Sequence, residues 1–358
     1  MQINVIVFSV TLLSGVALIV TQHKHGHWSL DTAFGVQNHH TSPTPRIGGV
    51  AVMVGLLAAW WLAVPDVHAI LSPMLLASVP AFTFGLAEDV LKRVGVMPRL
   101  LATMSSGLLA WYLTGVAMQN TGLPPLDWAL GFLPLAVLFT MFAVGGVANS
   151  INIIDGFNGL ASGAVAIMLA ALGIIAGNVG DAALATTCFT LAVCSLGFCA
   201  VNWPSGRIFL GDGGAYLLGF LLAWVAVLLP MRNPQVNAWT SFLVCAYPVL
   251  EVLFSVLRRR RREGHHPGQP DKVHLHHLIH RRVVCQVFPR LSSTIKNGLT
   301  SPICWFLVAV PALLSIAFAK NTFVLAFCFG CFCTAYFFIY ARLSQFRWCA
   351  TRVRASIN

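Results

Sequence analysis

The sequence predicts an all-α, polytopic membrane protein, and three observations lead to that fold class. Hydrophobic residues make up 57% of the 358 residues. Charged residues make up only 9%, whereas a soluble domain carries roughly 25%. Apolar runs long enough to cross a bilayer recur along the whole chain, and the charged residues lie between them.

The apolar runs have the length of membrane-spanning helices. We expect about 10 to 11 such helices, because roughly 17 to 23 apolar residues cross the hydrocarbon layer. The expected segments are 4–20, 47–64, 68–87, 99–117, 128–148, 158–178, 182–202, 213–230, 238–257, 299–319 and 322–341. The first segment lacks the basic stretch and the cleavage site of a signal peptide, so we expect it to be retained. No separate soluble domain is evident, and we expect one integral membrane domain over 1–358 with a long inner loop at about 258–298.

Lys and Arg residues predict the orientation of these helices, because cytoplasmic loops hold an excess of positive charge. If the N-terminus lies outside, all but two of the 22 Lys and Arg residues fall on the inside, and the exceptions are Arg232 and Lys320. The C-terminus then lies in the cytoplasm. This topology explains the net charge of +11, so we do not expect a nucleic-acid partner.

Five polar clusters interrupt the apolar pattern, all of them in inner loops or at inner helix ends. The clusters are Thr44-Pro-Arg46-Ile-Gly-Gly49, Glu88-Asp89, Asn149 to Asn158, Phe209-Leu-Gly-Asp212-Gly-Gly214 and His274-Leu-His276-His277. Asn149, Asn152 and Asp155 are three residues apart, so on a helix they share one face. Three such groups at the end of a membrane helix are costly without a ligand, and an active site at the inner membrane surface is therefore expected.

Two of the carboxylate clusters also have an ordinary structural interpretation. Glu88 and Asp89 form either a solvated acidic pair beside basic residues or a repelling pair that recruits a proton or a cation. Asp212 lies either in a common glycine-rich turn or at a helix start where a hard oxygen ligand binds Mg²⁺ together with a phosphate.

The histidine cluster has two chemical interpretations. His274, His276 and His277 could bind zinc, but no cysteine has a suitable spacing. The surrounding arginines repel cations, so we favour a phosphate or pyrophosphate anion as the ligand.

Taken in order, the motifs resemble the polyprenyl-phosphate N-acetylhexosamine-1-phosphate transferases of glycosyltransferase family 4, which include WecA, TagO and MraY. The resemblance covers about residues 40 to 285. Thr44 to Gly49 is similar to the first cytoplasmic loop of the family, and Glu88-Asp89 occupies the place of its Asp-Asp pair. Asn149 to Leu160 resembles the signature Asn-x-x-Asn-x-x-Asp-Gly-x-Asp-Gly-Leu, and Phe209 to Gly214 resembles Phe-(Met/Leu)-Gly-Asp-x-Gly. The His-x-His-His form is similar to WecA-like members rather than to MraY.

The resemblance implies an enzyme of the bacterial inner membrane with its active site on the cytoplasmic face. Such an enzyme transfers N-acetylhexosamine 1-phosphate from a UDP-sugar to undecaprenyl phosphate or another polyprenyl phosphate, releases UMP and begins a lipid-linked glycan, either O-antigen or a cell-wall polymer. Mg²⁺ is the implied cofactor, with Mn²⁺ as the second choice. Membrane lipids are further partners, and a homodimer is one option for assembly.

Two alternatives remain beside this interpretation. One is a phospho-N-acetylmuramoyl-pentapeptide transferase, which the His-x-His-His form disfavours. The other is a membrane transporter, a class that places ionisable residues near the middle of the bilayer. Only Glu251 approaches that depth in the sequence, so the enzyme is favoured.

The resemblance also implies a role for each polar residue. Asp212 would bind Mg²⁺, and Asp89, next to Glu88, would bind or deprotonate the lipid phosphate. Asn152, Asp155 and Asn158 would line the nucleotide-sugar pocket, with Glu88, Asp89, Asp155 and Asp212 as the catalytic set. The other expected substrate-binding residues are Arg46, Asn149, Phe209, His274, His276 and His277.

The chain departs from the family pattern at two positions. Glu88 replaces the first Asp of the pair and lengthens the carboxylate side chain by one methylene. Asn158 replaces the second Asp of the signature and removes a negative charge. An amide can still hydrogen-bond a uracil or a ribose, so we expect activity to be kept.

Overall fold

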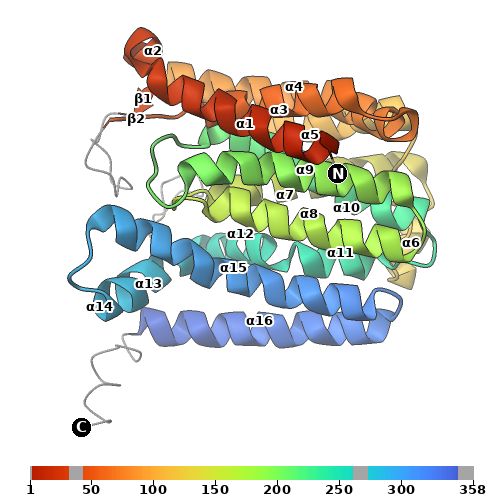
Figure 1. Cartoon of the computed structure of the whole chain (residues 1–358). Coiled ribbons are helices and arrows are strands. Elements are labelled where there is room, and N and C mark those ends of the chain that lie inside the picture. The colour runs from red at the N-terminus through yellow and green to blue at the C-terminus, as the bar shows by residue number, and fades with distance from the viewer. Residues whose placement is uncertain (1, 32–42, 261–272, 346–358) are drawn as a thin grey trace.

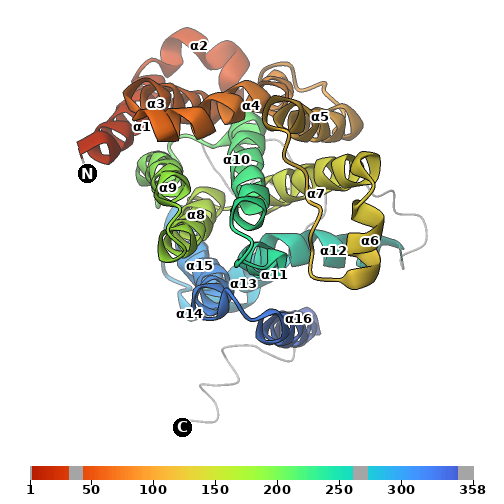
Figure 2. The ribbon, with the colours of Figure 1, turned by 90° about the vertical axis from the view of Figure 1, so that its right-hand side faces the viewer.

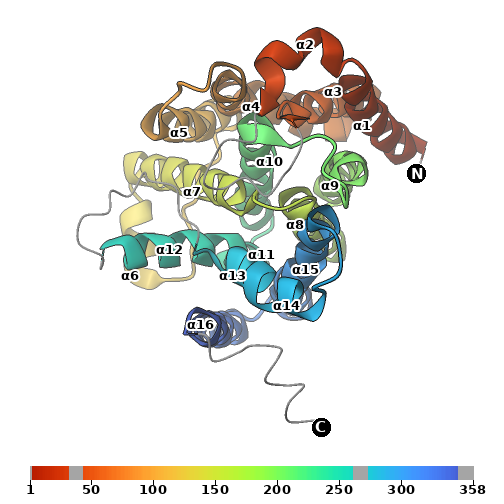
Figure 3. The same cartoon turned by 90° about the vertical axis from the view of Figure 1, so that its left-hand side faces the viewer.

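The computed structural model describes residues 2–31, 43–260 and 273–345, and these ranges are almost entirely helical. Their only sheet is a pair of two-residue strands, β1 (Leu30–Asp31) and β2 (Thr44–Pro45), which pair antiparallel. The long helices form one bundle, seen from the side in Figure 1 and from its two ends in Figures 2 and 3. The predicted all-α class is confirmed.

Among the residues that the structure describes, nine long helices form most of the bundle, and shorter helices connect them. The nine are α1 (Gln2–Val20), α4 (Pro65–Leu91), α5 (Val96–Thr114), α7 (Leu133–Ile154), α8 (Leu160–Asn178), α9 (Ala182–Asn202), α10 (Gly211–Arg232), α15 (Ser293–Phe318) and α16 (Thr322–Ser344). The shorter elements are α2 (Gln22–Ser29), α3 (Gly48–Leu62), α6 (Pro124–Leu130), α11 (Ala238–Val244), α12 (Ala246–Arg260), α13 (Leu275–Ile279), the π-helix η1 (His280–Val284) and α14 (Cys285–Val287).

Each of the eleven predicted segments coincides with a helix or, for 238–257, with the pair α11 and α12. Within the described ranges, eight helices are long and apolar enough to cross a membrane, and the bent pair makes a ninth if it is one span. This number of spans is lower than the predicted 10 to 11. Helix α3 is too short, with 15 residues, and α5 is less apolar than the other spans, with the charged Arg99 in its first turn. The protein is a multi-pass membrane protein, as expected.

Helix α10 lies at the centre of the bundle and positions the site residues. It packs against α3, α4, α7 and α8, and Figure 2 shows it surrounded by these helices. Glycines at its inner end allow close approach, since a Cβ on Gly213 would lie 3.0 Å from the backbone nitrogen of Leu86 in α4. A Cβ on Gly214 would lie 2.9 Å from the Cα of Gly49 in α3. Small residues at such contacts bring helix backbones together.

A break between α11 and α12 changes the direction of the chain by 74°. Helix α12 consequently runs across the bundle, as Figure 3 shows. Figure 1 shows α13 and α14 at the same end of the bundle as β1 and β2. The polar clusters of the sequence are therefore gathered at one end of the molecule.

Candidate active site

The loop before α3 is joined to the start of α10 by backbone hydrogen bonds. The N–H of Phe209 donates to the carbonyl of Pro45 at 2.8 Å, and the N–H of Gly48 donates back to Phe209 at 2.9 Å. Gly211 has a φ of +72°, and a Cβ there would collide with the carbonyl oxygen of Arg46. Only glycine fits this position, and its absence of a side chain lets Arg46 reach the first turn of α10.

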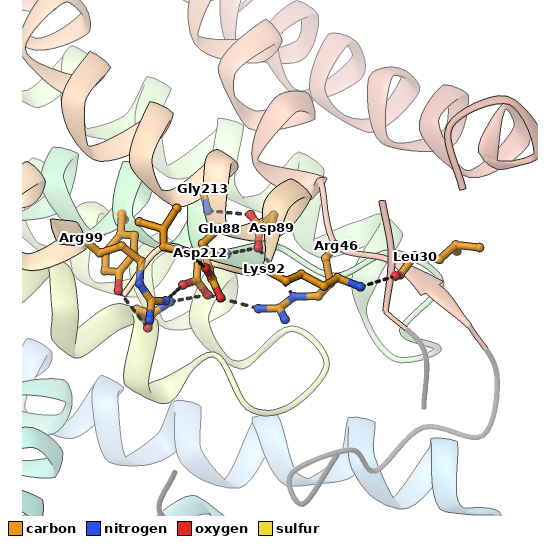
Figure 4. A network of polar contacts seen from close by, with 11 residues as sticks. Leu30, Arg46, Glu88, Asp89, Lys92, Arg99, Asp212 and Gly213 are labelled. Carbon is orange, nitrogen blue, oxygen red and sulfur yellow. Dashed lines mark hydrogen bonds and ion pairs between the residues drawn. The ribbon is translucent and has the colours of Figure 1, made fainter. Parts of the chain in front are cut away.

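Asp89 holds that first turn in place. Its side chain is 1% exposed, and its Oδ1 and Oδ2 accept the backbone N–H groups of Asp212 at 2.9 Å and Gly213 at 2.8 Å. Figure 4 shows both hydrogen bonds. The first N–H groups of a helix lack partners within the helix, so a carboxylate from α4 satisfies them here. Because both oxygens contact backbone, the geometry favours positioning of Asp212 as the role of Asp89.

Asp212 is contacted by residues from four segments: the loop before α3, and helices α4, α5 and α7. Its Oδ1 accepts from Arg46 Nη2 at 3.2 Å and from Asn152 Nδ2 at 3.1 Å. Its Oδ2 forms an ion pair with Arg99 of α5, which Figure 4 shows on the opposite side from Arg46. The hydroxyl of Tyr216 donates to Asn152 Oδ1 at 3.4 Å. A carboxylate, two guanidinium groups and an oriented amide thus form one charged cluster at the inner end of the bundle.

Two further acidic residues flank this cluster. Asp155 follows α7 directly, and desolvation together with the negative charge of Asp212 raises the pKa of its carboxyl to about 7, against the opposing effect of Arg46. Glu88 accepts the backbone N–H of Val94 at 2.7 Å through Oε2, which closes the turn between α4 and α5. The predicted catalytic residues therefore lie close together in the structure.

We call residues 274–277, the histidine cluster, the His loop. We call residues 155–158 the signature loop. The two segments lie against each other. The ring of Phe157 contacts His276 and His277 at centroid distances of 5.8 and 5.6 Å. A Cβ on Gly156 would lie 3.3 Å from His276 Nε2 and 3.7 Å from His277 Nε2. Gly156 therefore lets the two loops meet next to Asp155.

Two predicted substrate-binding residues lie outside this cluster. Asn149 donates through Nδ2 to Thr103 Oγ1 at 3.0 Å and ties α7 to α5. Asn158 is 2% exposed, and its Nδ2 donates to the carbonyl of Pro204 at 2.9 Å. Both amides stabilise contacts between segments in this structure, and a role for either in substrate binding stays a prediction.

Sequence reasoning missed two residues of the site, Arg99 and Tyr216. In the sequence, Arg99 is only one of the many positive charges assigned to the inside, although it lies in the first turn of the helix that follows Glu88 and Asp89. Tyr216 follows Asp212 by four residues, a spacing that places both on one helix face. That spacing is a signal that could have identified the tyrosine.

Comparison with known proteins agrees with the motifs now seen in the structure. The sequence profile of glycosyl transferase family 4 matches residues 71–230, which include Asp89 and Asp212. The chain is 27% identical over 253 residues to the undecaprenyl-phosphate alpha-N-acetylglucosaminyl 1-phosphate transferase of Yersinia pestis, with 68% of each chain covered.

A mycobacterial relative extends the same comparison. The chain is 30% identical over 290 residues to the decaprenyl-phosphate N-acetylglucosaminephosphotransferase of Mycobacterium leprae (strain TN), with 70% of this chain and 71% of the relative covered. This coverage includes more of the chain than the family profile. With its cluster of carboxylates assembled at one end of a helical membrane bundle, the chain belongs to glycosyl transferase family 4.

Proposed function

We propose that this protein transfers N-acetylhexosamine 1-phosphate from a UDP-sugar to a polyprenyl phosphate and releases UMP. The observation that carries the proposal is the position of Asp212, which Asp89 holds between Arg46 and Arg99 at one end of the bundle. The two relatives act, by their names, on undecaprenyl and decaprenyl phosphate. The enzyme class therefore follows from the family, and the chemistry follows from the charged cluster.

The reaction needs charge neutralisation and alignment rather than a covalent intermediate. A phosphate oxygen of the acceptor attacks the β-phosphorus of the UDP-sugar, the bond to the bridging oxygen breaks, and UMP leaves with the electron pair. Negative charge accumulates on the phosphoryl oxygens, and preorganised cationic donors stabilise it. Arg46 and Arg99 are such donors, and Asp212 holds both guanidinium groups in place.

We propose Mg²⁺ as the cofactor, with Mn²⁺ as the second choice. Mg²⁺ prefers oxygen ligands and commonly takes one or two carboxylates together with waters and substrate phosphates. The oxygens of Asp212 and of the adjacent Asp155 fit that requirement. The remaining coordination positions would be taken by waters and by phosphate oxygens of the substrate. When bound, the ion would neutralise charge on the diphosphate.

UDP-N-acetylglucosamine is the sugar donor that we propose first, because both relatives carry N-acetylglucosamine in their names. That choice also disfavours the pentapeptide transferase alternative. The product would begin a lipid-linked glycan such as O-antigen or a cell-wall polymer. Against the transporter alternative, Glu251 is not an isolated charge, because it contacts His274 at 3.1 Å.

Measurement of UMP release tests this proposal. Purified protein with Mg²⁺ and undecaprenyl phosphate should release UMP from UDP-N-acetylglucosamine, and omission of the lipid should stop the release. A panel of UDP-N-acetylglucosamine, UDP-N-acetylgalactosamine and UDP-N-acetylmuramoyl-pentapeptide identifies the sugar. UMP release from the pentapeptide donor alone would favour the pentapeptide transferase, and no release from any donor would contradict the proposal.

We further propose that the site faces the cytoplasm, with the N-terminus outside the bacterial inner membrane, because positive charge gathers at the inner loops. Asn120 and Gly95 are both exposed, and a Cβ on Gly95 makes only an ordinary contact with Pro98. In intact cells, a cysteine replacing Asn120 should react with a membrane-impermeant thiol reagent, and a cysteine replacing Gly95 should react only after permeabilisation. The unmodified protein serves as the control for its own exposed Cys331. Labelling at position 95 in intact cells would reverse the orientation.

A further inference from the structure

A fully buried carboxylate on α12 lies behind the His loop. Glu251 is 1% exposed, and its Oε2 is 3.1 Å from Nδ1 of His274. Its Oε1 accepts the backbone N–H of Leu275, the first residue of α13, at 3.0 Å. The same Oε1 is 3.7 Å from Nδ1 of His276. One carboxylate therefore contacts three consecutive residues of the loop.

Burial of this carboxylate requires compensation. An unpaired charge in a low-dielectric interior costs several kcal/mol, and ionisable residues at membrane depth are usually functional. For Glu251, contacts that offset this cost come from the His loop, in which His274 lies 23 residues further along the chain. The fold thus places the carboxylate of Glu251 next to the imidazole rings of His274 and His276.

The chemistry of the contact determines which nitrogen of His274 is available. A carboxylate only accepts hydrogen bonds, so Nδ1 of His274 must carry the proton that it donates to Glu251. Nε2 is then the ring nitrogen that can face a ligand. The hydrogen bond from Nδ1 to Glu251 also fixes the orientation of the ring, and so the direction in which Nε2 points.

His276 supplies a second, independent observation. Its side chain is fully buried, its Nδ1 faces Glu251 Oε1 at 3.7 Å, and its Nε2 has no hydrogen-bond partner in the described ranges. The ring stacks on His274 at a centroid distance of 5.3 Å with an interplanar angle of 5°. Its Nε2 faces Gly156 of the signature loop. A buried ring nitrogen without a partner, next to the signature loop, is suited to a polar group of a substrate.

We propose that Glu251 is a positioning residue that holds the His loop in the orientation that binds the diphosphate of the UDP-sugar. It acts through His274 and through the N-terminus of α13, and it does not touch the substrate. The inference rests on the proposed function, because the diphosphate belongs to the proposed donor.

The test compares the kinetics of Glu251→Gln with those of the wild type, using UMP release. Gln keeps the shape and an acceptor for the N–H of Leu275, but it removes the charge behind His274. The KM for UDP-N-acetylglucosamine should rise by about tenfold, the scale of a weakened charged hydrogen bond. The KM for undecaprenyl phosphate should not change, and kcat should stay close to wild type, because ground-state binding of the donor is lost.

A double-mutant cycle shows whether Glu251 acts through the histidine. In a His274→Gln background, Glu251→Gln should raise the donor KM no further. Asp181→Asn is the matched control, because Asp181 is also an ion-paired carboxylate, bound to Arg232 Nε at 2.8 Å at the other end of α10. This control should lower thermal stability and leave the donor KM unchanged. If Glu251→Gln does not fold, Glu251→Asp is measured in the same way, and a smaller rise is expected, because Asp keeps the charge but is one methylene too short to reach both His274 and Leu275.

Each outcome has a distinct meaning. An active wild type with an unchanged donor KM in the Glu251 variant would overturn the role of Glu251. Equal increases in the KM values for donor and acceptor, or full additivity with His274→Gln, would also overturn it. A wild type that releases no UMP from any UDP-sugar would instead overturn the proposed function.

Discussion

Asp212→Asn should abolish transfer even at saturating UDP-sugar. The carboxamide keeps the shape of the side chain but loses the charge that holds Arg46 and Arg99. It also removes the hard anionic oxygen that Mg²⁺ prefers. We expect turnover to fall by about 10³-fold or more, since a metal and its charge contribute several kcal/mol to the transition state.

Asp66→Asn is the matched control for this change. Asp66 also lies in the first turn of a bundle helix, α4, and it is exposed at the end of that helix remote from Asp89. Its replacement should leave turnover close to wild type. Thermal melting in detergent shows whether the Asp212 variant is folded. A folded Asp212→Asn protein with full activity would exclude Asp212 from the mechanism.

Asp89→Asn should lower turnover by about 10²-fold, the scale on which a positioned catalytic group contributes. The structure gives the physical reason. Both carboxylate oxygens of Asp89 accept backbone N–H groups of the first turn of α10, and an amide has only one oxygen with which to accept. The turn that carries Asp212 should therefore lose its position. The Asp89→Asn variant should also melt at a lower temperature than the wild type, because a buried backbone N–H is left without a partner.

The pH dependence of the rate distinguishes the two roles of Asp89. A positioning role predicts an unchanged profile at a reduced rate, and a general-base role predicts loss of the acidic limb. Glu88→Asp is the comparison, because Glu88 accepts the N–H of Val94 and so stabilises the turn between α4 and α5 rather than the first turn of α10. Its turnover should stay near wild type. Equal and small effects of Asp89→Asn and Glu88→Gln would contradict both roles.

The helices could be predicted from the sequence because their length and apolarity are local properties. The sequence does not predict the break between α11 and α12, since the run 238–257 is mostly apolar and has the length of one membrane span. Pro248 lies in the first turn of α12, but proline alone could not mark the break, because Pro73 and Pro80 lie inside the continuous helix α4. The break matters to the site, because it turns Glu251 toward the His loop.

The membership of the site could be predicted in large part, and the contacts within it could not. The ordered motifs identified Arg46, Asn152 and Asp212, which the structure brings into direct contact. The bonds from Asp89 to the backbone of α10 depend on how two distant helices pack, which no local pattern contains. For the same reason the sequence could not indicate that the amide of Asn158 bonds to Pro204.

The fate of the β-phosphate tests the central claim most directly. Purified protein is incubated with undecaprenyl phosphate, Mg²⁺ and UDP-N-acetylglucosamine labelled in the β-phosphate, and the lipid and aqueous fractions are then separated. Transfer of sugar 1-phosphate predicts that the label enters the lipid fraction while UMP appears in the aqueous fraction in equal amount. Label that stays in the aqueous fraction as UDP, with the sugar alone on the lipid, would contradict the account.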